Sequence, residues 1–144
     1  MHHTRIATRL TDRPHPTPTD IDIAHPYRRR WWLPIIGPSA TVLLDHLTHT
    51  ATDHWQVHDA TELAIRLGLG KGTGRHSPLI RTCDRLVTFG FGRYDIEPGD
   101  PTAEPCLTIW TTTSIVTERS TRRWPEPMRR AHTADLEALH QLFP

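Results

Sequence analysis

The chain has 144 residues, 36% of them hydrophobic, and a mean hydropathy of −0.51. This length fits one domain plus tails, and no apolar run approaches the length of a membrane-spanning helix. The formal net charge is only +1, so the overall charge does not by itself indicate a nucleic-acid partner. Two cysteines make no disulfide framework, and no apolar segment near the start fits a secretory signal, so we expect a cytoplasmic protein.

The first 26 residues are rich in Pro, Thr and His and show no sustained hydrophobic periodicity. We therefore predict a disordered tail over residues 1–26. The alternative is a basic arm that follows a DNA groove, since Arg5, Arg9 and Arg13 lie in its first half.

The next ten residues combine three arginines with two tryptophans and an apolar run. Large aromatic side chains mostly supply buried area, so we expect this segment to fold over the domain as core. The expected core residues are Trp31, Leu33, Ile35 and Ile36. The alternative is a binding segment in which Trp31 and Trp32 stack on bases or on a partner.

A helix is predicted after Gly37-Pro38, with Ser39 as its cap. Its apolar face consists of Ala40, Leu43, Leu44, Leu47 and Ala51. We expect this helix to support the two helices that follow. Residues 55–57 predict a short strand that pairs with a hairpin later in the chain.

Two further helices are predicted on either side of a glycine-rich loop. Asp59 and Glu62 have the spacing of a capping box, and Gly68 suits the left-handed residue that ends a helix. The second helix, over residues 77–90, begins with Ser77 as cap and Pro78 in the first helical position. The loop between them is not a nucleotide-binding P-loop, because its glycines and lysine do not have the required spacing.

Strands are predicted over residues 91–96 and 106–112, separated by an acidic Pro/Gly-rich loop. The order helix, helix, hairpin over roughly residues 38–112 resembles a winged helix-turn-helix domain. The resemblance is carried mostly by residues 59–68 and 86–93. It implies an α+β, mainly helical fold: a winged helix-turn-helix over residues 27–113 with a two-stranded wing hairpin, and extra C-terminal helices over residues 114–144.

The resemblance also implies that the second helix of the pair enters the major groove of double-stranded DNA. Six basic residues and one acidic residue lie between Arg66 and Arg93, and this charge pattern agrees with that role. Arg81 and Arg85 would reach base edges or phosphate. The predicted DNA-binding residues are Lys71, Arg75, His76, Ser77, Arg81, Thr82, Arg85 and Arg93.

Two features of the composition qualify this picture. All basic residues except Lys71 are arginine, a bias typical of a GC-rich, actinobacterial-type genome. The expected wing carries four acidic residues and no basic one after Arg93. Phosphate would repel this wing, so we expect no wing contact beyond Arg93.

The C-terminal part contains a short helix capped by Thr117 and a final helix from about Pro127 to Phe143. One stripe of the final helix is formed by Met128, His132, Leu136, Leu139 and Phe143. It predicts either a homodimer through this helix or packing on the same domain. A second basic cluster lies nearby: Arg119, Arg122, Arg123, Arg129 and Arg130.

No catalytic motif is present, and the carboxylates are not paired for acid–base chemistry. The eleven histidines lack a zinc-site spacing, and Cys83 falls on an apolar face. We therefore predict no enzyme, no cofactor and no metal site.

The sequence predicts a protein that binds double-stranded DNA sequence-specifically and acts in transcriptional regulation. The alternative is a protein-interaction module, or a phage or mobile-element accessory factor, on the same scaffold. Its interface would be the acidic wing, Trp31, Trp32 and the C-terminal helix. A role in DNA replication or partition would use a similar domain.

Overall fold

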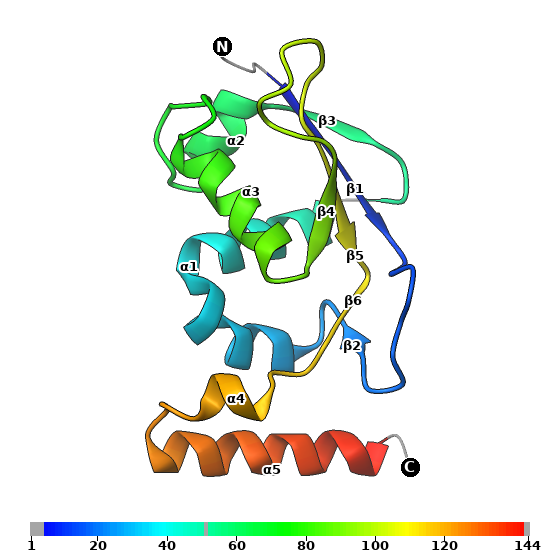
Figure 1. Ribbon diagram of the computed structural model, residues 1–144, viewed down its shortest axis with the longest axis vertical. Helices are drawn as coiled ribbons and strands as arrows, with labels where there is room; N and C mark the ends of the chain where they lie inside the picture. Colours follow the sequence, from blue (N-terminus) through cyan, green and yellow to red (C-terminus); the bar gives the residue numbers. More distant parts are fainter. Residues whose placement is uncertain (1–4, 51, 143–144) are drawn as a thin grey trace.

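Figure 1 shows the computed structural model, which describes residues 5–50 and 52–142. The described part is an α+β fold with a four-stranded and a two-stranded sheet. None of its helices is long and apolar enough to cross a membrane. The elements are β1 (Arg5–Thr11), β2 (Ile21–Asp22), α1 (Pro26–Thr50), β3 (Gln56–Asp59), α2 (Ala60–Arg66), α3 (Pro78–Thr88), β4 (Gly92–Ile96), β5 (Cys106–Trp110), β6 (Thr112–Thr113), α4 (Glu118–Thr121) and α5 (Glu126–Leu142).

The four-stranded sheet has the order β3-β1-β5-β4, so β1 lies in its interior. β1 pairs in parallel with β5 and antiparallel with β3. This placement corrects the expectation of disorder for the segment from Arg5, while residues 1–4 fall outside the described part. Residues 5–10 do not alternate apolar and polar side chains, since Ile6 is followed by Ala7 and Thr8 by Arg9, so the local pattern does not indicate a strand.

The two strands predicted for the wing are present, and β4 and β5 pair antiparallel. The short strand expected near residues 55–57 is also present as β3. However, β3 pairs with β1 and not with the hairpin, because β1 lies between them. The sheet therefore contains a strand that the predicted winged arrangement lacks.

Helix α1 consists of two helical segments on either side of Gly37. Gly37 has φ 85°, in the left-handed region that side chains with a Cβ rarely adopt. The second segment is the predicted supporting helix, whereas the first was expected only as a core segment. Trp31 and Ile36 are buried as expected, but Leu33 is 37% exposed.

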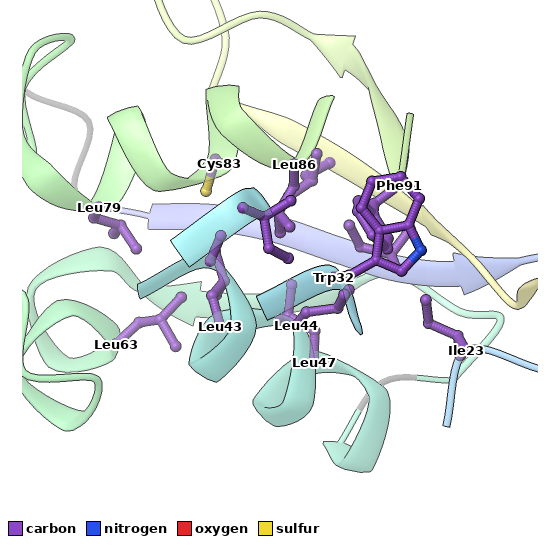
Figure 2. Close-up of a cluster of buried hydrophobic side chains, with 14 of the residues drawn as sticks. Ile23, Trp32, Leu43, Leu44, Leu47, Leu63, Leu79, Cys83, Leu86 and Phe91 are labelled. Atoms are coloured by element: carbon purple, nitrogen blue, oxygen red, sulfur yellow. The ribbon is translucent and has the colours of Figure 1, made fainter. Parts of the chain in front are cut away.

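Helices α1, α2 and α3 lie on one side of the four-stranded sheet (Figure 1) and bury their apolar faces there. Figure 2 shows the centre of this core, where Leu43, Leu44 and Leu47 of α1 meet Leu86 of α3. Leu67, which follows α2, and Val87 of α3 are only partly buried against this core. The core also includes Ile6, Ile21, Val116 and Leu139, so all three predicted parts of the chain share it.

Helix α5 packs against the first segment of α1. The Tyr27 hydroxyl accepts a hydrogen bond from the Val116 amide and lies 2.7 Å from Nε2 of His132 on α5. Burial lowers the pKa of His132, and the nearby Asp135 carboxylate opposes this shift. Trp31 stacks on Trp124 with ring centroids 5.6 Å apart.

The stripe of α5 is therefore covered by its own chain. His132 and Leu139 are buried, and Met128 and Leu136 are partly buried against the core. This is the second of the two predicted roles for the stripe, packing on the same domain. Phe143 lies outside the described residues.

Candidate nucleic-acid interface

The helix pair α2 and α3 has the ends that the sequence predicts. The Asp59 carboxylate accepts a hydrogen bond from the Glu62 amide at 2.8 Å, and the Ser77 hydroxyl accepts one from Ile80 at 3.4 Å. Gly68, with φ 72°, follows α2 in the left-handed conformation. These local interactions fix where α3 begins and therefore which of its side chains face solvent.

Helix α3 buries Leu79, Cys83 and Leu86, which leaves Arg81 and Arg85 exposed. They line a groove of about 410 Å³ between α3 and the bend of α1, whose opposite wall includes Pro38 and Ser39. The sequence predicted the two arginines on this face. It marked Gly37-Pro38-Ser39 only as a helix start, and nothing local indicated that the bend would face α3.

The two arginines differ in what holds them. Arg85 donates a hydrogen bond through Nη2 to the Ile35 carbonyl at 3.2 Å, and its guanidinium lies 5.6 Å from the Phe89 ring centroid. Within the described part of the chain, no ion pair engages Arg81. Arg81 is therefore the freer cation, and Arg85 keeps further N–H donors for a ligand.

Two predicted contacts on this helix are already engaged. The Thr82 side chain is buried, with only 6% of the residue exposed, and its hydroxyl donates to the Pro78 carbonyl at 2.7 Å. The Ser77 hydroxyl caps the helix. Thr82 therefore supports the groove wall, and its hydroxyl is not free for DNA.

Arg75 is also engaged. Its Nη1 donates to Asp84 at 2.7 Å, and the other Asp84 oxygen accepts from the Tyr94 hydroxyl at 2.7 Å. The hydrogen bond to Asp84 raises the pKa of Arg75, and burial raises the pKa of Tyr94. Arg75 thus ties the loop to α3, while Lys71 and His76 of the same loop are exposed.

Arg93 is not brought into this group. Tyr94 reaches Asp84 on α3, so its neighbour Arg93 points to the opposite face of the sheet. There Arg93 pairs with Asp95 at 3.3 Å and lies over the Trp110 ring. The structure therefore does not bring Arg93 together with the other predicted DNA-binding residues, Arg81 and Arg85.

Arginines of β1 partly neutralise the acidic wing. Arg5 pairs with Glu104 at 2.9 Å, and Arg9 lies 3.7 Å from Asp95. The sequence could not indicate these pairs, because the partners are far apart in the chain and β1 was expected to be disordered. Repulsion between the wing and a polyanion is therefore weaker than the sequence implied.

Other reactive side chains are engaged or buried. The His58 ring lies 2.8 Å from the Thr8 hydroxyl, and burial, with His46 nearby, lowers the pKa of His58. Burial raises the pKa of Cys83 to about 12, which suits an unreactive thiol. Across residues 5–50 and 52–142, no group of three or more His, Cys, Asp or Glu side chains could hold a metal ion.

What remains on this side is a set of exposed cationic or polar groups, here called the α3 surface: Lys71, His76, Arg81 and Arg85. Guanidinium groups donate paired N–H bonds to phosphate or to the guanine edge, so Arg81 and Arg85 have the donors to bind an acceptor of either kind. No protein-family model, no curated protein and no solved structure matches the chain.

Proposed function

We propose that this protein binds double-stranded DNA through the α3 surface. The observation that carries the proposal is the pair Arg81 and Arg85, one helical turn apart on the solvent face of α3 and beside an open groove. An α-helix fits the major groove, where arginine pairs with guanine are the commonest specific contact. Lys71, which is exposed in the preceding loop, would contact phosphate and so set the register.

We further propose that the binding is sequence-specific and serves transcriptional regulation. The resemblance of α2, α3 and the β4–β5 hairpin to a winged helix-turn-helix supports this role. The proposed contacts do not require the wing, because Arg93 points away from α3 and the loop beyond it is acidic. Specificity would then reside in α3 and the loop before it.

The test is the double variant Arg81→Ala/Arg85→Ala. Each good arginine–base pair contributes about 1–3 kcal/mol, so the dissociation constant for a selected duplex should rise at least about tenfold. Fluorescence anisotropy with a labelled duplex measures it. The matched control is Arg66→Ala/Arg93→Ala, which removes the same charge from α2 and from the far face of the sheet. The control should retain most of the affinity.

Equal affinities of the two double variants would contradict the groove assignment. Because Arg85 also bonds to the Ile35 carbonyl, the single variant Arg81→Ala separates binding from folding. Arg81→Ala should weaken binding at an unchanged melting temperature.

The alternative interface would need Trp31 and Trp32 at the surface, but both side chains are buried in this fold. The two residues are 3% and 8% exposed, and the Trp32 indole donates to the Ser114 carbonyl. The apolar stripe of α5 is likewise covered by the core. We therefore propose no second function.

A further inference from the structure

A second basic surface lies at the junction of α4 and α5, far along the chain from α3. It consists of five exposed arginines, here called the α4–α5 surface: Arg119, Arg122, Arg123, Arg129 and Arg130. Of these five arginines, only Arg130 has an ion-pair partner among the described residues, and this partner is Glu126 at 3.1 Å. The other four guanidinium groups take part in no ion pair or side-chain hydrogen bond of the described chain, so the fold does not use their charge.

This surface is held in a fixed position. Trp124, between α4 and α5, stacks on Trp31 of α1, and the Trp31 indole donates to Asp135 of α5 at 2.7 Å. Asp135 also accepts from Arg30 at 3.1 Å. The buried Tyr27–His132 contact adds a further link between the same two helices. The five arginines therefore lie on helices that are held against α1 by several contacts.

The same helical segment of α1 also contacts the α3 surface. Trp31 contacts the C-terminal helices, and the Ile35 carbonyl, four residues later, accepts the hydrogen bond from Arg85 of α3. Four residues of helix span about 6 Å. In Figure 1 the start of α5 and the loop before it lie on the same side of the molecule as the bend of α1 and the loop before α3, at the left of the view. One extended polyanion can therefore pass along both surfaces.

We propose that the α4–α5 surface binds the phosphate backbone of the same DNA duplex, beyond the segment that α3 reads. This inference rests on the proposed function and extends the length of duplex that the protein contacts. The unused guanidinium groups suit phosphate, which they bind with paired N–H donors. None of these five arginines lines the α3 groove, so we expect their contacts to add affinity without reading bases.

The experiment compares two duplexes with the same central sequence, one of about 10 base pairs and one of about 30, or roughly one and three helical turns. The test variant is Arg122→Gln/Arg123→Gln/Arg129→Gln in the full chain. The control is Arg5→Gln/Arg66→Gln/Arg93→Gln, which removes the same charge elsewhere. Dissociation constants are measured by fluorescence anisotropy over a salt series.

The wild-type protein should bind the long duplex more tightly than the short one. The test variant should lose at least about tenfold on the long duplex at low salt, with a salt slope shallower by about 3, because each of the three lost phosphate contacts removes about 0.9. On the short duplex the test variant and the control should match.

Two results would overturn this inference alone, both with wild-type binding intact. One is equal affinity of the test variant and the control on the long duplex. The other is an equal loss by the test variant on both duplexes, since the arginines would then belong to the central contact. If the wild-type protein binds neither duplex, the proposed function fails, and this inference fails with it.

Discussion

Asp84 illustrates how a single residue helps to position the α3 surface. Its carboxylate accepts hydrogen bonds from Arg75 in the loop and from Tyr94 in β4, and so joins both segments to α3. Asp84 comes three residues after Arg81, so helical spacing places both on one face of α3. The sequence could not indicate that Arg75, nine residues before Asp84, would pair with it, because this contact depends on the path of the loop.

Gly92 offers a test at the residue scale. A Cβ added there would lie 2.0 Å from the Thr108 carbonyl oxygen on the adjacent strand β5, so Gly92→Ala must push β4 and β5 apart. Overpacking of this kind costs roughly 1–3 kcal/mol of unfolding free energy, occasionally more. Urea unfolding followed by circular dichroism measures the change.

The matched control for this substitution is Gly99→Ala, in the loop between β4 and β5. An added Cβ at Gly99 meets nothing within 4 Å, so Gly99→Ala should stay within about 0.5 kcal/mol of the wild type. Equal stability of the two variants would show that β4 and β5 do not approach each other as described.

At the scale of elements, the parts of the fold set by local interactions were predictable. The caps of α2 and α3 at Asp59 and Ser77 need only neighbouring residues, and β4 alternates polar and apolar side chains from Arg93 to Ile96. The position of β1 was not predictable, because its pairing with β5 joins residues about a hundred positions apart. The bend at Gly37 was recognisable as a break, but its place beside α3 depends on packing.

The buried position of β1 leads to a stability prediction. Ile6, which is 1% exposed, packs into the core under the sheet, so Ile6→Ala should lower the free energy of unfolding by roughly 2–5 kcal/mol. Ile65 on α2 is 53% exposed, so the same change there should cost about 0.5 kcal/mol or less. Thermal or urea unfolding of both variants measures the difference. If Ile6→Ala is as stable as Ile65→Ala, residues 5–11 are not a strand in the interior of the sheet.

At the scale of the whole molecule, the net charge of +1 conceals a separation of charge. Exposed cations lie on the α3 surface and the α4–α5 surface. The acidic residues of the β4–β5 hairpin lie elsewhere, next to the arginines of β1. The sequence located both basic clusters because each is local in the chain. It did not show that β1 would offset the wing, or that α1 would join the two basic surfaces.

The most direct test of the central claim is an anisotropy titration of the wild-type protein against a random duplex at several salt concentrations. If Lys71, Arg81 and Arg85 each neutralise a phosphate, the logarithm of the binding constant should fall with the logarithm of the salt concentration with a slope of about −3. Engagement of the α4–α5 surface would make the slope steeper. Absence of binding at low salt, or binding that salt does not weaken, would contradict the proposal that this protein binds DNA.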